Sequence, residues 1–290
     1  MRLVPLLVLS MLWSAGCAAT TQPISPTLPP ATRTAFPSTP TALPASVTPS
    51  NTPSTAPTKT PTNTATGTPA ARPLPTTTPT TALTSRLNDQ TQALTERLIR
   101  SAEAGDTITV RRLLQEGADI NGRDAEGRTA VMAATERDRV DTVGALIQAG
   151  ADINIRNNRL DNPFLYASAE GLLEILKLTI DAKADTRLTN RFGGTALIPA
   201  AERGHVEVVN ELLTRTDVDV NHVNRLGWTA LLEAIILGNG GTRHTEVVRL
   251  LVEAGADVNL ADANGVAPLS HAQQRGYGQI VKSLRKAGAR

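Results

Sequence analysis

Cysteine, aromatic residues and, over a long stretch, acidic residues are scarce in this chain of 290 residues. Cys17 is the only cysteine, so no internal disulfide can stabilise the fold. Aromatic side chains make up 2% of the chain, too few to stack bases along a nucleic-acid strand. Residues 18–84 contain no Asp or Glu, whereas all 27 acidic residues and 25 of the 29 basic ones lie from Ser85 onward. That second part is therefore slightly acidic, and we expect no nucleic-acid partner.

Signatures of catalysis are missing as well. The chain has no Gly-x-Ser-x-Gly nucleophile elbow, no Gly-x-x-x-x-Gly-Lys phosphate loop and no His-Glu-x-x-His zinc motif. Cys17 has no base near it in the sequence. The histidines lack the carboxylate spacing of a metal site and are His205, His222, His244 and His271. His205 directly follows Gly204, and this pair of residues indicates a structural role for His205. We expect no catalytic residue, no cofactor and no metal.

The N-terminus has the pattern of an export signal. A short positive start precedes an apolar run of eleven, residues 3–13, which is too short for a bilayer span of roughly 20 residues. The following Ser-Ala-Gly-Cys motif, which ends at Cys17, resembles a bacterial lipobox, although Ser14 stands where that family usually has an aliphatic residue. The resemblance implies removal of a signal peptide, residues 1–16, and acylation of Cys17. An ordinary secretory signal is the alternative.

A Thr/Pro-rich segment, residues 17–84, follows the signal and includes the stretch TPSNTPSTAPTKTPTNTATGTP. Its prolines oppose regular helix and strand, and it has too few apolar residues to offset the entropy of ordering. We predict a disordered linker, with a reach of up to about 200 Å if it adopts the polyproline form. Anchored at Cys17, it would form a stalk that holds an exported domain off the cell membrane or outer membrane, outside the cytoplasm.

A motif recurs beyond the linker at intervals of 33, 33, 34 and 38 residues, a period that indicates stacked repeats. Its copies begin at Thr129, Asn162, Thr195, Thr229 and Ala267. A Thr or Asn at this position can cap a helix through its side chain, whereas Ala267 cannot. Pro199 lies deeper in its predicted helix than Pro163 and Pro268, so we expect it to cost one hydrogen bond. A second apolar helix follows in each unit, and the recurrent Ala-Gly-Ala-Asp-Ile/Val-Asn closes it at residues 149–154 and 254–259. Its Asp-Asn pair fits turn chemistry.

The length, caps, glycines and apolar positions together resemble the ankyrin repeat over residues 85–290. The resemblance implies an all-α solenoid of about six stacked helix–turn–helix pairs, including caps, with β-turn or hairpin tips. We expect an N-terminal unit around Leu94–Asn121, four full repeats and a last repeat truncated at Arg290. The histidine common in the family's Thr-Pro-Leu-His motif is replaced here, so packing should substitute for its hydrogen bond. The replacing residues are Met132, Leu165, Ile198, Leu232 and Ser270.

The repeat that begins at Asn162 diverges most, because Leu160 replaces the turn glycine and Lys183 replaces the usual closing glycine. Either this repeat is strained, or the additional Phe164 and Tyr166 fill more of the core. The second interpretation is favoured, since Phe164 occupies the buried leucine position of the pattern.

In ankyrin-like stacks the partner usually contacts the turn tips and the ends of the inner helices. We predict contact residues at the tips and just before the capping threonine, namely Arg159, Arg191, Phe192, Arg225, Leu226 and Trp228. The matching helix-end residues are Arg137, Glu202, Arg203, Ile236 and Leu237. Trp and Arg are enriched in binding hot spots. The alternative is that the arginines are solvated and that Trp228 packs on a neighbouring turn. An insertion, residues 238–243, is expected to lengthen one rim of the groove.

The sequence leaves three functional hypotheses. The favoured one is a monomeric, membrane-tethered interaction module that binds an envelope or extracellular protein through the groove. The second is an accessory factor that stabilises an envelope enzyme or transporter. A degenerate hydrolase hidden in the repeats is the weakest.

Overall fold

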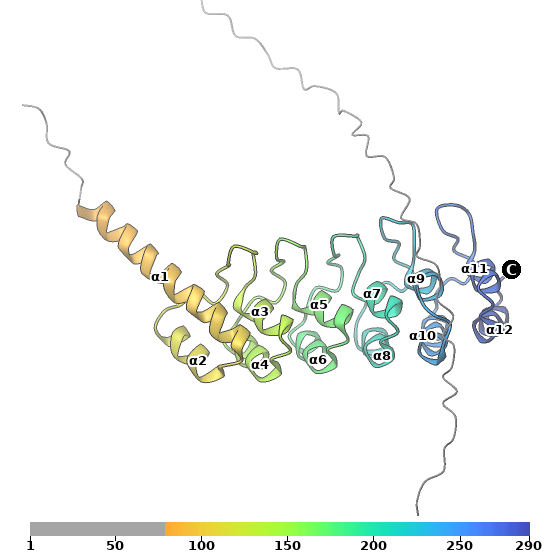
Figure 1. Cartoon of the computed structure of the whole chain (residues 1–290), viewed down its shortest axis with the longest axis horizontal. Coiled ribbons are helices and arrows are strands. Elements are labelled where there is room, and N and C mark those ends of the chain that lie inside the picture. Colours follow the sequence, from red (N-terminus) through yellow and green to blue (C-terminus); the bar gives the residue numbers. More distant parts are fainter. Residues whose placement is uncertain (1–78) are drawn as a thin grey trace, which may run out of the picture. The chain divides into compact units, whose positions relative to one another are not determined.

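The repeats of this chain each fold into two helices joined by a short turn, and the pairs stand side by side (Figure 1). The computed structural model describes residues 79–290, with side chains from Asn88 onward. Its twelve helices over that range form six pairs, and no strand is assigned among these described residues. The predicted all-α solenoid is therefore confirmed. Cys17, the signal and nearly all of the predicted linker lie outside the described residues.

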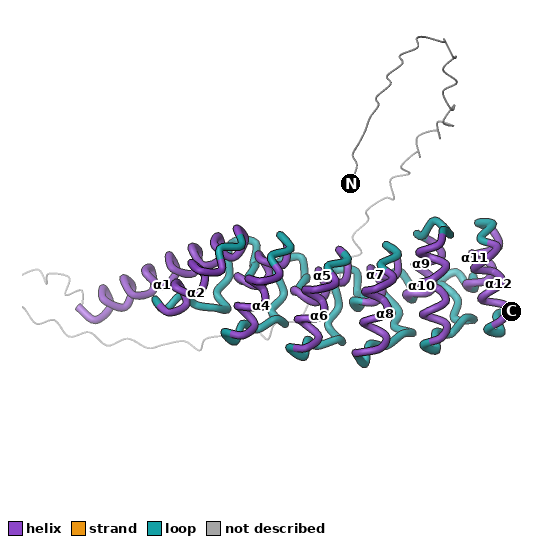
Figure 2. The backbone as a smooth tube through the Cα atoms, turned by 90° about the horizontal axis from the view of Figure 1, so that it is seen from below, coloured by secondary structure: helices purple, strands orange, loops and turns teal. Residues whose placement is uncertain are grey.

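The helices fall into two layers (Figure 1, Figure 2). The first helices of the pairs, called inner helices here, are α1 Pro79–Ala104, α3 Ala130–Glu136, α5 Pro163–Glu170, α7 Leu197–Glu202, α9 Ala230–Ile236 and α11 Pro268–Gln274. The second, outer helices are α2 Thr107–Gln115, α4 Val140–Gln148, α6 Leu173–Asp181, α8 Val206–Arg215, α10 Thr242–Glu253 and α12 Gly278–Lys286. Each inner helix contacts the next inner helix, and each outer helix the next outer one. One continuous apolar core runs through all six pairs.

Helix α1 begins at Pro79, six residues before the boundary expected at Ser85. No proline follows Pro79 in this segment, so nothing in the chain prevents the helix from extending. Residues 88–93 are exposed, and burial begins near Leu94. The buried part includes Leu98, which joins the core where α1 meets α3. The packed part of α1 therefore starts where the first unit was predicted.

The predicted caps form in three repeats. The side-chain oxygens of Thr129, Asn162 and Thr229 accept the backbone N–H three residues later, at 3.4, 2.8 and 3.2 Å. Ala267 makes no side-chain cap, as expected. The prediction for Thr195 is wrong: its buried hydroxyl has no hydrogen-bond partner, and α7 begins only at Leu197.

Pro199 explains the missing cap. In the other capped repeats the carbonyl of the capping residue accepts the N–H four residues later, as in Ala133 to Thr129 at 3.0 Å. Pro199 has no N–H to offer at that place. The Thr195 carbonyl instead accepts the N–H of Ile198 at 3.2 Å, so this donor is no longer available to the Thr195 hydroxyl. The proline thus costs the repeat both a backbone bond and its cap.

A ladder of asparagine side chains fixes the spacing between repeats. Within a repeat, an aspartate accepts the N–H of the asparagine two residues later, as Asp152 does from Asn154 at 2.8 Å. This confirms the predicted turn chemistry. The asparagine then accepts a backbone N–H of the next repeat, as Asn154 does from Asp185 at 2.9 Å. Arg187 takes the asparagine place in the following repeat and interrupts the ladder.

Both interpretations of the divergent repeat hold in part. Leu160 and Lys183 adopt the left-handed backbone, with φ of 63° and 62°, which is strained for side-chain-bearing residues. Phe164 is fully buried, whereas Tyr166 is half-buried and faces the groove described below. The residues at the lost histidine position are buried at Met132, Leu165, Ile198 and Leu232, so packing replaces that bond in four repeats.

Candidate partner-binding groove

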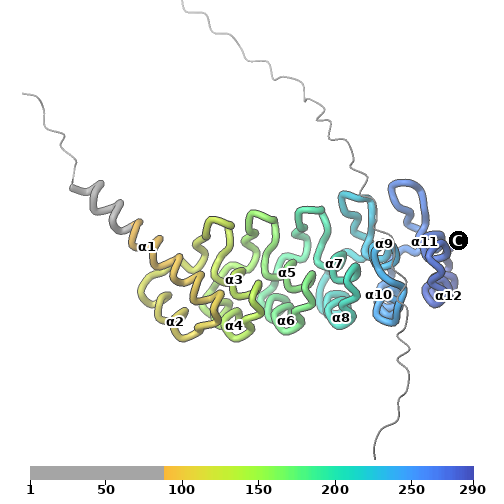
Figure 3. The backbone as a smooth tube through the Cα atoms, viewed as in Figure 1, coloured from red at the N-terminus to blue at the C-terminus, as the bar shows by residue number. Residues whose placement is uncertain are grey.

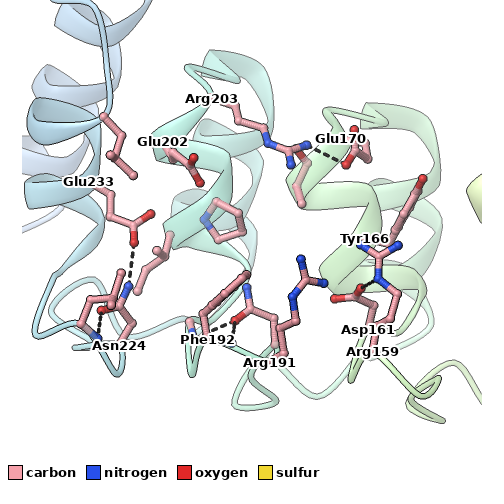
Figure 4. A pocket seen from close by; sticks show the side chains of 17 residues that line it. Arg159, Asp161, Tyr166, Glu170, Arg191, Phe192, Glu202, Arg203, Asn224 and Glu233 are labelled. Carbon is pink, nitrogen blue, oxygen red and sulfur yellow. Dashed lines mark hydrogen bonds and ion pairs between the residues drawn. The ribbon is translucent and has the colours of Figure 1, made fainter. Parts of the chain in front are cut away.

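A hollow of about 260 Å³ lies across the three repeats that begin at Asn162, Thr195 and Thr229 (Figure 4). We call it the groove. The loop residues that line it are Arg159, Asp161, Asn190, Arg191, Phe192, Gly194, Asn224 and Leu226. The inner-helix residues that line it, together with those at the helix ends, are Tyr166, Ala169, Glu170, Ile198, Pro199, Glu202, Arg203, Glu233 and Leu237.

The loops before the inner helices project on one side of the stack in a regular row (Figure 3). Each begins with an Asn or Asp whose side chain holds the loop closed. In the Thr195 repeat, Asn190 Oδ1 accepts the N–H groups of Phe192 and Gly194 at 2.9 and 3.0 Å. Asn157 and Asn224 make the equivalent bonds in the neighbouring loops. This asparagine clamp sets the tip conformation without help from a partner.

The clamp places matching residues at matching tips. The residue two positions after the asparagine is Arg159, Phe192 or Leu226 in successive loops, and all three line the groove. The floor repeats in the same manner, because the fourth residue after each capping position is Tyr166, Pro199 or Glu233. Groove residues therefore come from fixed positions of the repeat.

Seven of the eleven predicted contact residues line the groove, namely Arg159, Arg191, Phe192, Leu226, Glu202, Arg203 and Leu237. The other four lie outside it. Arg225 links two tips, because its backbone N–H donates to Phe192 O at 3.0 Å and its guanidinium to Arg191 O at 2.9 Å. Arg137 forms an ion pair with Glu103 at 2.8 Å. Trp228 and Ile236 are half-buried beside the groove residues Leu226 and Leu237 in the chain.

The insertion also lies outside the groove, since none of residues 238–243 lines it. It is tied to its neighbours instead. The His244 ring that follows it donates from Nε2 to Glu202 O at 2.8 Å, while Nδ1 lies 3.0 Å from Asn239 Oδ1. The Tyr277 hydroxyl donates to Gly238 O at 2.8 Å. Asn239 of the insertion thus contacts the His244 ring, and that ring holds the backbone of Glu202 at the end of α7.

Apolar side chains stand exposed around the groove. Phe192, Leu226 and Leu237 are 52%, 54% and 50% exposed. They are three of the five large hydrophobic side chains that are exposed among the described residues, and all three line the groove. Isolated exposed hydrophobics are ordinary, but a cluster rimmed by polar groups marks an interaction site.

The charges of the groove are only partly paired. Arg203 forms an ion pair with Glu170 at 2.6 Å, and Arg159 approaches Asp161 at 3.8 Å. The Arg191 guanidinium stacks on the Phe192 ring, 4.6 Å from its centre. The Glu202 carboxylate has no hydrogen-bond or ion-pair partner among the described residues, although the backbone of this residue is held by His244.

Glu233 is one of the ten groove residues that are not among the predicted contact residues. Its side chain is 5% exposed and accepts a hydrogen bond from Asn224 Nδ2 at 2.6 Å. Burial and the negative charge of Glu202 raise the pKa of Glu233 to about 7. A signal for it exists: the nine-residue spacing from Asn224 to Glu233 recurs from Asp262 to His271, which also pair, at 2.9 Å.

Three more residues of these repeats have shifted pKa values. Burial raises the pKa of Asp161 and Tyr166 and lowers the pKa of His205. His205 has the structural role predicted for it, since its Nε2 donates to Ala169 O at 3.1 Å. Within residues 79–290 no three His, Cys, Asp or Glu side chains converge as a metal-binding group.

Comparison with known proteins agrees with this architecture. The model of the family described as ankyrin repeats (three copies) matches residues 84–157 and 164–262. The ankyrin repeat protein YahD of Escherichia coli (strain K12) is 43% identical over 189 residues, which cover 65% of this chain and 94% of YahD. A solved ankyrin repeat domain from Acinetobacter baumannii AYE is 51% identical, with a TM-score of 0.65, and covers 67% of this chain and 98% of that one. The ankyrin repeat domain of Bcl-3 has 26% identity and a TM-score of 0.60, covering 67% and 86%. The chain belongs to the ankyrin repeat family, whose fold is in general a scaffold for protein–protein interaction.

Proposed function

We propose that the chain is an exported, membrane-tethered module that binds an envelope or extracellular protein through the groove. The observation that carries the binding role is the cluster of Phe192, Leu226 and Leu237, each about half exposed, around one hollow. Exposing these side chains to water is unfavourable, and a partner that covers them recovers the loss. The repeat has fixed their positions beforehand, so little ordering entropy is lost on binding.

The groove also has the arrangement of a protein-binding site. Its apolar side chains stand beside the stacked pair Arg191–Phe192, and arginine and aromatic residues are enriched where interfaces are strongest. Ion-paired arginines form part of its wall, as in the Arg203–Glu170 pair. At about 260 Å³ the hollow is smaller than the pockets of roughly 300–1,000 Å³ that enclose small-molecule ligands. It is better suited to side chains that project from a partner surface.

Support for the tether comes from the sequence. The apolar run, the Ala-Gly-Cys triplet that ends at Cys17 and the Thr/Pro-rich segment have the order of a lipid-anchored stalk. The alignment with YahD leaves 35% of this chain unmatched while it covers 94% of YahD, so this chain carries a long segment in addition to its repeats. Among the helices of residues 79–290, none is long and apolar enough to serve as a membrane span.

The anchor is tested with Cys17→Ser. Cells that express the wild type or the variant are labelled with a clickable fatty acid and separated into membrane and soluble fractions. We expect the wild type to be labelled and membrane-bound and the variant to be unlabelled and released. A Cys17→Ser chain that stays in the membrane fraction to the same extent as the wild type would refute the anchor.

The binding role is tested by photo-crosslinking in cells. A photoactivatable phenylalanine analogue replaces Phe192 in one strain and Ile108 in another. Ile108 is a matched control, because it is 83% exposed on α2 and lies outside the groove. We expect a discrete protein adduct from position 192 and none from position 108. Adducts of the same protein from both positions, or from position 108 alone, would place the interface elsewhere.

A further inference from the structure

The charge of the groove is uneven along its length. Four carboxylates and three guanidinium groups line it. Two of the carboxylates, those of Asp161 and Glu170, have arginines beside them. Among the described residues no arginine or lysine forms an ion pair with Glu202 or Glu233, and both line the hollow from the neighbouring inner helices α7 and α9 (Figure 4). One part of the groove is therefore acidic.

Arg191 does not compensate this acidic part. Its guanidinium stacks on the Phe192 ring. Its charge lowers the pKa of Asp161, although burial raises that pKa by more. The groups that act on Glu233 are Glu202 and the amide of Asn224, and no cation of the described residues is among them. Two carboxylates that repel each other in a half-enclosed site bind a cation more strongly than a single exposed carboxylate would.

We propose that the groove recognises a partner segment through a lysine or arginine side chain seated between Glu202 and Glu233, with an adjoining apolar residue against Leu226 and Leu237. This rests on the proposed protein-binding function and specifies the chemistry of the partner. The long basic side chains suit the site, because their carbon stems pack on apolar surface while their charged ends reach carboxylates. An arginine would contact both carboxylates with its planar fork of donors.

The structure prepares both carboxylates for this role. Glu233 is held by the Asn224 amide, which is itself the clamp of its loop. Glu202 ends α7, and its carbonyl is held by His244. Both acids thus stand on a fixed backbone, and the Glu233 carboxylate is also held by Asn224, so little ordering of Glu233 is lost on binding.

The test selects peptides from a random-sequence display library on the full chain. The same library is selected on Glu202→Gln/Glu233→Gln, and on Glu207→Gln as the matched control. Glu207 is an exposed carboxylate on α8, outside the groove and without a partner among the described residues. The glutamine at position 233 keeps the acceptor for Asn224, and circular dichroism verifies that each variant is folded.

We expect the wild type and Glu207→Gln to enrich peptides with a Lys or Arg beside an apolar residue. Affinity of one such peptide should fall by about tenfold or more in the double variant and decrease with salt. The inference would be overturned if the selected peptides lack a basic residue, or if they bind the double variant as well as the wild type. If such peptides still fail to bind Phe192→Ala, the proposed function stands. Peptides unaffected by Phe192→Ala and Leu237→Ala, or a selection that yields none, would count against both.

Discussion

Asn224 and Glu233 are joined by a side-chain hydrogen bond of 2.6 Å on the floor of the groove. The two residues belong to different parts of the repeat, the loop and the inner helix α9. Asn224 also accepts the N–H groups of Leu226 and Trp228, so one amide connects the buried acid to the loop tip. Glu233 and the backbone of the loop tip are therefore held by the same amide group.

Because Glu233 is buried beside Asn224, we predict that the stability of the chain decreases as the pH rises from about 4.5 to about 7. The pKa of Glu233 is raised to about 7 in the folded chain from 4.5, so the folded state holds the proton more tightly than the unfolded one. Stability from this group is full below pH 4.5 and is lost as the pH rises through 7. Glu233→Gln should remove the loss and exceed the wild type by about 2 kcal/mol at pH 8.

The measurement is urea unfolding at several pH values between 4 and 8. Glu207→Gln, which makes the same charge change on an exposed outer helix, should leave the pH profile of the wild type unchanged. A Glu233→Gln profile that runs parallel to the wild type over this range would show that Glu233 titrates normally.

Replacing threonine by valine at the capping position should have opposite effects on stability in the repeats that begin at Thr195 and Thr229. The buried hydroxyl of Thr195 has no partner, so Thr195→Val removes an unsatisfied polar group at nearly constant shape and should stabilise the chain by about 1 kcal/mol. Thr229→Val removes a working cap and should destabilise it by about 1 kcal/mol. Thermal or urea unfolding of the two variants decides the matter. A loss of stability in Thr195→Val equal to that in Thr229→Val would mean that both hydroxyls cap.

Much of the fold was predictable because the same sequence signals recur in several aligned copies of the repeat. The period, the caps at Thr129, Asn162 and Thr229, and the tip positions of Phe192 and Leu226 all follow from aligned copies. Local rules suffice for these features, since each concerns residues within a few positions of one another.

What could not be predicted depends on exceptions and on contacts between copies. The missing cap at Thr195 could not be predicted without knowing that the Ile198 N–H donates to the Thr195 carbonyl when Pro199 has no N–H to donate. The limits of the groove, which leave Arg225 outside and include Glu233, depend on three repeats stacking together. The nine-residue spacing shared by Asn224–Glu233 and Asp262–His271 was visible in the sequence, but only the structure shows that these positions meet.

Replacing Lys183 by glycine should stabilise the folded chain. Lys183 holds the left-handed conformation with φ of 62°, at the place where Gly150 of the preceding repeat has φ of 92°. Lys183→Gly should raise the free energy of unfolding by about 1 kcal/mol, because the conformational strain is relieved. The reciprocal Gly150→Ala should lower it by a similar amount, although its Cβ would meet no atom within 4 Å. Equal stabilities for Lys183→Gly and the wild type would show that the strain is offset elsewhere.

The central claim is that the groove binds a protein through its exposed apolar side chains. The direct measurement is the Kd of the protein crosslinked at position 192 for the wild type, Phe192→Ala and the control Ile108→Ala, by calorimetry. Phe192→Ala should weaken binding by about 30-fold or more, which corresponds to about 2 kcal/mol, while Ile108→Ala leaves it unchanged. Trp228→Ala, made beside them, reports whether the interface extends past the groove to the base of its loop. Equal Kd values for Phe192→Ala and the wild type would contradict the claim.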